Sequence, residues 1–158
     1  MIILDLDNCI ADDEWRIPSI NWHKKDPTAR YHDYHALAAF DTVHSHHLWV
    51  GKQCAIFTAR PIAFRAPTME WLRRCGVQFE FLLMRNNDDH RSSCDLKATQ
   101  LKWLLDPLLY GVHRHEIEMA YDDRQDVVDM YLAEGVPAQR AFIHSTCAYT
   151  NPSLKEPA

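Results

Sequence analysis

Hydrophobic residues gather in short runs along the chain, and each run has about the length of a β-strand. The runs are "MIILDL" at 1–6, "QCAIFT" at 53–58, "VQFEFLLM" at 77–84, "EIEMAY" at 116–121 and "RAFIHS" at 140–145. Short runs that are rich in β-branched and aromatic residues and bounded by polar residues are typical of buried strands. The pattern therefore predicts five strands.

The segments between these runs carry helical patterns. We expect helices over 32–48, 62–75, 95–109 and 125–134, with Gly76 and Gly135 as C-terminal caps of two of them. Pro67 predicts that the second helix starts late or bends. Strands that alternate with helices indicate a doubly wound α/β fold, a mainly parallel five-stranded sheet with helices on both faces.

Length and composition narrow the class of protein. A chain of 158 residues that is 47% hydrophobic fits one domain, which we place at 1–145, with a tail at 146–158. The 5 cysteines are odd in number and form no C-x-x-C pair, which argues against a disulfide framework and a zinc ribbon and favours a reducing compartment. No membrane span or signal peptide is predicted, so we expect a cytoplasmic protein. The net charge of -5 favours only local contact with a nucleic acid.

Polar residues follow the predicted strands where each strand ends. Because ligands bind at the carboxyl ends of parallel strands, these residues should meet in one crevice. Like charges about 4 Å apart repel by a few kcal/mol at an effective dielectric of about 20, so clustered carboxylates need a cation or raised pKa values. An all-oxygen cluster suits Mg²⁺. The residues are Asp5 and Asp7, Thr58 and Arg60, Arg85, and Asp122 and Asp123.

Basic and hydroxyl residues supply the other half of phosphoryl chemistry. A transferring phosphoryl group spreads negative charge over its oxygens, which positioned cations and hydrogen-bond donors stabilise. Thr58, Arg60 and Lys97 can serve in this way. Lys97 lies in the first turn of a predicted helix, where the macrodipole is already positive, so a bound anion explains its place better than helix stability does.

Four motifs in order resemble those of the haloacid dehalogenase (HAD) superfamily of phosphatases: "DLDNC", "IFT", "DLK" and "YDD". The resemblance implies a HAD-like Rossmannoid fold in which Asp5 is the nucleophile, Asp7 the general acid and base, and Thr58 and Lys97 hold the phosphoryl oxygens. It further implies that Mg²⁺ is held by the Asp5 carboxylate, the Asp7 backbone carbonyl and the Asp123 side chain, with Asp122 behind them or bound through water. Cys9 departs from the family, which has threonine or valine there.

The segment 12–31 is too short for a cap domain and is expected to form an extended flap beside an open site. An open site suits a macromolecular substrate, or a second copy of the chain that supplies the lid. In or next to this segment, four aromatic residues lie near basic residues: Trp15, Trp22, Tyr31 and Tyr34. These rings can stack a nucleic-acid base or serve as ordinary packing.

A closer resemblance is to the 3′-phosphatase domains of phage polynucleotide kinase/phosphatases. It rests on Arg16, eleven residues after Asp5, on "TAR", on the loop "RNNDDHRSSCDLK" and on "YDDRQDVVDMY". Ser93 departs from those domains, which have an aspartate there, and Asp95 is the nearest carboxylate that could replace it. The substrate-binding candidates are Arg16, Arg60, Arg85 and Asn8.

These features predict a Mg²⁺-dependent phosphomonoesterase that removes 3′-phosphates from polynucleotide ends. Two alternatives remain open: a nucleotidase or small-phosphoester phosphatase of the same fold, and a non-catalytic binding module. The three candidate arginines can also be salt-bridge partners of nearby acids rather than substrate contacts. No G-x-x-x-x-G-K-[ST] motif occurs in the chain, so phosphatase chemistry without a kinase is expected.

Overall fold

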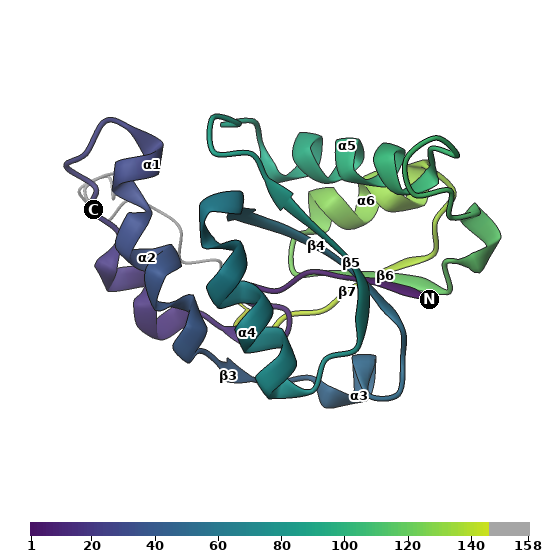
Figure 1. The fold of residues 1–158 in the computed structure, drawn as a ribbon, viewed down its shortest axis with the longest axis horizontal. Coiled ribbons are helices and arrows are strands. Elements are labelled where there is room, and N and C mark those ends of the chain that lie inside the picture. The colour runs from purple at the N-terminus through teal and green to yellow at the C-terminus, as the bar shows by residue number, and fades with distance from the viewer. Residues whose placement is uncertain (146–158) are drawn as a thin grey trace.

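The computed structural model describes residues 1–145 and consists of a central sheet with helices on both faces (Figure 1). The sheet has five strands in the order β5-β4-β1-β6-β7, and every neighbouring pair is parallel. The doubly wound α/β fold is therefore confirmed. The strands are β1 (Ile2–Leu4), β4 (Cys54–Pro61), β5 (Phe79–Arg85), β6 (Met119–Asp122) and β7 (Ala138–Arg140).

Side-chain alternation along the strands divides the core into two layers. Ile2 and Leu4 point to the face covered by α4 (Arg65–Cys75), where they pack in one buried cluster with Trp71. Ile3 points to the opposite face, which α5 (Ser93–Leu105) and α6 (Gln125–Ala133) cover. Figure 1 shows α5 and α6 together on one side of the sheet and α4 on the other. Strands buried on both faces explain the nearly continuous hydrophobic runs.

Helix ends follow their capping residues. Gly76 closes α4 with a φ of 76°, a left-handed conformation that glycine adopts at little cost. Pro67 lies in the first turn of α4, where its missing N–H is not needed, so the predicted late start is confirmed. α5 ends at Leu105 rather than at residue 109, because Asp106 precedes a proline and is extended, with a ψ of 118°.

Two predicted elements are wrong. The helix expected over 32–48 is broken into α2 (His32–Ala36), a 3₁₀ turn η2 (Leu37–Phe40), the short strand β3 (Thr42–Val43) and α3 (His46–Trp49). α2 already ends at Ala36, and the chain leaves the helical conformation at Asp41, which has a ψ of 143° and whose side chain joins a buried ion-pair group described below. The strand expected over 140–145 overlaps β7 only at Arg140, because the partner β6 ends at Asp122 and leaves the later backbone no strand to pair with.

The flap is also not extended. Residues 12–41, here called the helical insert, contain η1 (Glu14–Ser19), α1 (Pro27–Arg30), α2 and η2. The insert lies to one side of the sheet (Figure 1). At its base, β2 (Ala11–Asp12) pairs with β3 in a separate two-stranded antiparallel sheet. The remaining 3₁₀ turns are η3 (Ile62–Phe64) and η4 (Arg114–Glu116).

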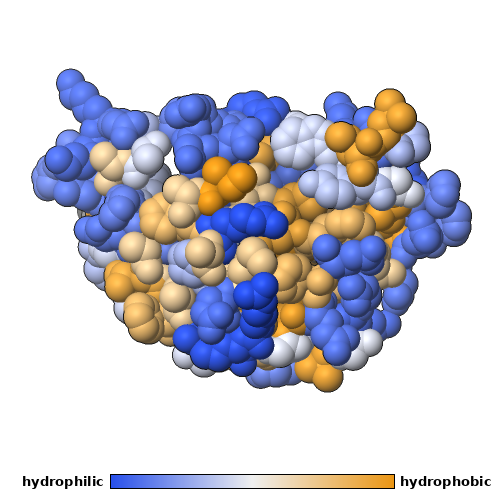
Figure 2. Space-filling model, viewed as in Figure 1, coloured by the Kyte–Doolittle hydropathy of each residue, from blue (hydrophilic) through white to orange (hydrophobic). Residues whose placement is uncertain are grey.

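The surface mixes polar and apolar side chains (Figure 2). Apolar side chains project where the chain leaves α5, and Leu108 there is 91% exposed. Within residues 1–145, no helix combines the length and apolar character needed to cross a lipid bilayer.

Candidate active site

Three buried carboxylates meet at the ends of two neighbouring strands. Asp5 follows β1, and Asp122 and Asp123 stand at the end of β6, which pairs with β1. One oxygen from each carboxylate lies within 4.8 Å of the others. The parallel register of β1 and β6 thus brings together residues that are far apart in the sequence.

Lys97 reaches this cluster from the first turns of α5. Its Nζ lies 2.7 Å from Asp5 Oδ1 and also pairs with Asp122 Oδ2, and its side chain is only 2% exposed. Burial raises the pKa of the Asp5 carboxyl above its ordinary range, and Asp122 and Asp123 add to this rise while Lys97 opposes it. Several buried carboxylate oxygens this close together, with Lys97 paired to two of the carboxylates, fit a divalent hard cation such as Mg²⁺.

Asp7 is held by two buried arginines, Arg16 and Arg60, here called the arginine clamp. Asp7 Oδ1 lies 2.5 Å from Arg16 Nη2 and 2.6 Å from Arg60 Nη2, and both arginine side chains are fully buried. Burial alone would raise the pKa of Asp7, but Arg60 and Arg16 hold it well below its usual range. The Asp7 carboxylate is therefore ionised at neutral pH.

Asp41 binds the two arginines of the clamp and so completes a buried group of two arginines and two aspartates. No local sequence pattern marks Asp41. It accepts hydrogen bonds from Arg16 Nε at 2.9 Å and Arg60 Nη2 at 3.2 Å, and a further one from Trp15 Nε1 at 3.0 Å. Its carboxylate is fully buried. Two arginines and two aspartates cancel in charge, which lets the group remain in the interior.

Arg16 and Arg60 were expected to bind substrate, but their guanidinium groups lie behind Asp7 and are not among the residues that line the pocket described below. Thr58 is likewise buried, and its Oγ1 accepts a hydrogen bond from the Arg60 N–H at 3.2 Å. Arg16 and Arg60 thus orient Asp7, and Thr58 contacts the backbone of Arg60.

Arg85 and Asn8 also make internal contacts. The Arg85 guanidinium donates to the backbone carbonyls of Ala59, Asp89 and Arg91, and so fixes the loop that follows β5. Asn8 has a φ of 58°, and its Nδ2 donates to Asp123 Oδ2 at 3.1 Å. Asn8 also exchanges hydrogen bonds with the backbone of residue 144, which joins the last described segment to the acidic cluster.

Asp95, the carboxylate that could replace the aspartate missing at position 93, does not line the pocket. Asp95 Oδ2 accepts a hydrogen bond from Ser92 Oγ at 2.7 Å, and the Asp95 N–H donates to the same hydroxyl at 3.1 Å. This arrangement caps α5. Ser93 itself lines the pocket, whereas Asp95 does not.

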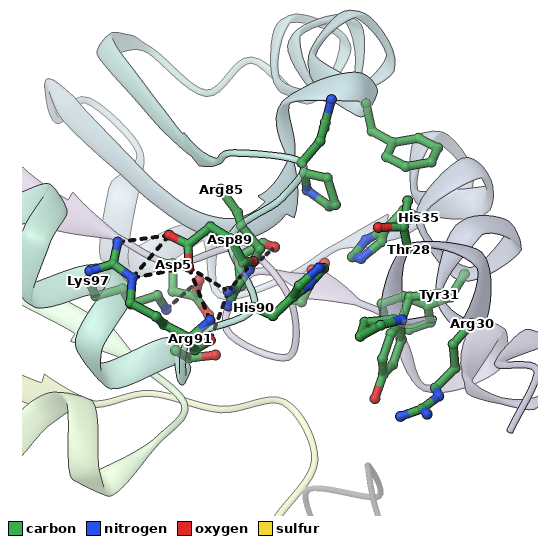
Figure 3. Close-up of a pocket in the computed structure, with 18 of the residues that line it drawn as sticks. Asp5, Thr28, Arg30, Tyr31, His35, Arg85, Asp89, His90, Arg91 and Lys97 are labelled. Carbon is green, nitrogen blue, oxygen red and sulfur yellow. Dashed lines mark hydrogen bonds and ion pairs between the residues drawn. The ribbon is translucent and has the colours of Figure 1, made fainter. Parts of the chain in front are cut away.

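A pocket of about 430 Å³ opens above Asp5 (Figure 3). Its floor includes Asp5, Asp7, Lys97 and Asp123. One wall belongs to the helical insert and η3, and the other belongs to the loop between β5 and α5, as the two groups of labelled side chains in Figure 3 show. The first wall contributes Thr28, Arg30, Tyr31, His35 and Phe64, and the second Arg85, Asn87, Asp89, His90 and Arg91.

His35 in the first wall yields a pH-dependence prediction. Burial lowers the pKa of its imidazole from 6.5 to about 3. Between these values the unfolded chain binds the proton and the folded chain does not, so stability is fully present above about pH 6.5 and falls as the pH decreases. Chemical denaturation should show the free energy of unfolding of the wild type falling by up to about 2 kcal/mol more than that of His35→Gln between pH 7 and pH 5. An equal fall in both proteins would contradict a buried neutral His35.

Comparison with known proteins shows the fold. No protein-family model and no curated protein matches the chain. A chain of the "Structure of Pnkp1/Rnl/Hen1 complex" superposes with a TM-score of 0.63 at 23% identity over 89% of this chain. A chain of the "Structure of the Pnkp1/Rnl/Hen1 RNA repair complex" superposes with a TM-score of 0.61 at 21% identity over 90% of this chain. The match spans 44% and 43% of those chains, so this chain corresponds to less than half of either.

Proposed function

We propose that the chain is a Mg²⁺-dependent phosphomonoesterase that removes 3′-phosphates from polynucleotide ends through a phosphorylated Asp5. The observation that carries the proposal is the pocket floor, where Asp5 lies between Lys97 and the buried carboxylates of Asp122 and Asp123. This arrangement supports the proposal, because phosphoryl transfer requires a nucleophile, a cationic group and a bound cation close together, and a carboxylate, an ammonium and further carboxylates meet here. The HAD-like motifs of the sequence agree with it.

The proposed ligand set combines the family resemblance with the contacts of the acidic cluster. Asp5 and Asp123 would hold Mg²⁺ through carboxylate oxygens, together with the backbone carbonyl of Asp7. Asp122 is paired with Lys97 and would support these ligands without binding the cation directly. When bound, Mg²⁺ would offset the repulsion among the carboxylates and neutralise phosphate oxygens. Lys97 would stabilise the remaining negative charge of the phosphoryl group.

Asp5 and Asp7 then divide the chemistry. A carboxylate oxygen of Asp5 attacks phosphorus, the bond from phosphorus to the 3′ oxygen breaks, and Asp7 gives that oxygen a proton. In the second step Asp7 takes a proton from the water that attacks the phosphorylated Asp5, releasing phosphate and restoring the carboxylate. Asp7 can carry the proton for the first step only when the arginine clamp holds its carboxylate less tightly. The substrate phosphate would loosen this contact by competing with Asp7 for the arginine side chains.

Support for a polynucleotide end comes from the rim of the pocket and from the shared fold. Arg91 and Arg124 line the pocket with side chains 48% and 42% exposed, where they can meet the phosphates of a strand. The superposed chains come from an RNA repair complex.

Phosphate release tests the proposal. Purified protein with Mg²⁺ should release phosphate from a 3′-phosphorylated oligonucleotide more efficiently than from the matching 3′-mononucleotide. Preference for the mononucleotide would favour the nucleotidase alternative. Failure to hydrolyse any phosphoester would favour the non-catalytic binding module.

Replacing Asp123 by asparagine is expected to weaken Mg²⁺ binding at least about tenfold, because a neutral amide replaces one of the buried carboxylates. Titration calorimetry with Mg²⁺ alone measures this effect without reference to catalysis. The matched control is Asp129→Asn, since Asp129 is an exposed residue of α6 that pairs only with Gln125 among the contacts described. Equal Mg²⁺ affinity in the two variants would remove Asp123 from the ligand set.

A further inference from the structure

Three rings form a continuous surface on the insert side of the pocket. Tyr31, His35 and Phe64, here called the ring wall, all line the pocket and are partly buried. The centroid of the His35 ring lies 6.2 Å from that of Tyr31 and 5.5 Å from that of Phe64. The wall therefore presents aromatic rings to the pocket, and Figure 3 shows Tyr31 and His35 across the pocket from Arg85 and Arg91.

The ring wall is held from behind. Tyr34 packs against both Tyr31 and His35, with ring centroids 6.2 and 5.1 Å away, and its hydroxyl donates to Asp13 Oδ2. Trp22 packs edge-on against Tyr31 at 6.0 Å. Of the four aromatic residues named in the sequence analysis, Tyr31 and Tyr34 line the pocket. Trp22 supports Tyr31, and Trp15 donates a hydrogen bond to Asp41. Rings that are already fixed lose little entropy when a ligand stacks on them.

The opposite wall is fixed as well. Arg85 braces the loop through the carbonyls of Asp89 and Arg91. The Asn87 side chain accepts a hydrogen bond from the Ala63 N–H at 3.0 Å, which ties this loop to η3 beside Phe64. The two walls thus enclose a preformed slot, aromatic on one side and edged by the cationic Arg91 on the other.

The depth of the nucleophile decides how a strand can enter this slot. The Asp5 side chain is 8% exposed and that of Lys97 is 2% exposed. A 3′-phosphate that reaches Asp5 must descend to the pocket floor, so the nucleoside that carries it must stand between the walls. A base still paired to an opposite strand would bring that strand into the same space.

We infer that the slot takes the terminal nucleoside of a 3′-phosphorylated strand unpaired, with its base against the ring wall. The inference rests on the proposed function and adds its substrate class, a single-stranded or frayed 3′ end. His35 contributes an uncharged ring, because its pKa is lowered by burial, and its buried Nδ1 has no hydrogen-bond partner among the described residues. Such a wall is tolerant of base identity, since every base has a stacking face.

Equilibrium binding without Mg²⁺ tests the slot separately from catalysis. Three fluorescent ligands are compared by anisotropy: a 3′-phosphorylated single strand, the same strand ending in a 3′-phosphorylated abasic residue, and the first strand fully paired in a blunt duplex. Wild type should bind the first ligand about tenfold or more tightly than either of the others, the factor expected for one stacked base. Equal dissociation constants for the normal and abasic ends, or for single strand and duplex, would overturn the inference.

Variants of the ring wall test whether the binding preference for the normal end arises there. Tyr31→Leu should reduce the preference for the normal over the abasic end to within about threefold, and Phe64→Leu provides a second wall variant if the first unfolds. The matched control is Tyr110→Leu, because Tyr110 is 46% exposed, packs on Phe81 and does not line the pocket. A preference that survives both wall replacements would overturn the inference. Phosphate release measured in parallel separates the two claims, since an intact binding preference without hydrolysis contradicts the proposed function alone.

Discussion

Replacing Asp5 by asparagine should reduce phosphate release on the order of 10⁴-fold or more, because the neutral amide cannot attack phosphorus. The loss should appear in kcat at saturating Mg²⁺ and substrate. Measurement of phosphate release from a 3′-phosphorylated oligonucleotide by wild type and variant gives this ratio directly. Turnover that survives in Asp5→Asn would exclude Asp5 as the nucleophile.

The fold of the Asp5 variant should be intact, which separates a chemical loss from a structural one. Lys97 keeps its ion pair with Asp122, and the substitution removes one of the three repelling carboxylates. We therefore expect the free energy of unfolding to change by no more than about 1 kcal/mol. Asp129→Asn, on the exposed side of α6, serves as the control for both turnover and stability.

Replacing Asp41 by alanine should destabilise the protein by about 3–5 kcal/mol, because it leaves Arg16 and Arg60 buried with only Asp7 to balance their charges. The same change should lower phosphate release, since Asp41 orients the arginine clamp that holds Asp7. Asp41→Asn, which keeps the size and part of the hydrogen bonding, should lie between wild type and alanine in both properties. Urea denaturation and phosphate release measure the two effects.

A surface pair supplies the control for this prediction. Lys52 and Glu118 form an ion pair at 2.7 Å with both side chains about half exposed, so Glu118→Gln should cause no measurable change in stability. If Asp41→Ala behaved like Glu118→Gln, the buried group of two arginines and two aspartates would have no role in holding the insert to the sheet.

Four of the five strands of the sheet were predictable because each is marked by a local hydrophobic run, whereas β7 has no such run. Ile2, Ile3 and Leu4 are buried on both faces of the sheet, so the run is hydrophobic without interruption. The helix over 32–48 failed for the opposite reason. Asp41 leaves the helical conformation to meet Arg16 and Arg60, and a helical pattern does not report partners 25 and 19 residues away.

The site was predictable only in part. The meeting of Asp5, Lys97 and Asp123 follows from their places at strand and helix ends in a parallel sheet. The burial of the arginine clamp does not, because a guanidinium group that binds substrate and one that holds a carboxylate have the same sequence signature. The ring wall was hidden as well, since Tyr31 and Phe64 belong to segments that only the folded insert brings together.

Partitioning of the phosphoryl group between water and an alcohol tests directly whether Asp5 becomes phosphorylated. Reactions in methanol-containing buffer yield methyl phosphate and free phosphate, and their ratio is measured for 3′-phosphorylated strands and for a small phosphoester with a different leaving group. A common phosphorylated Asp5 has lost the leaving group, so one ratio is expected for all substrates. A ratio that changes with the leaving group would mean that water attacks the substrate directly, and would contradict the account.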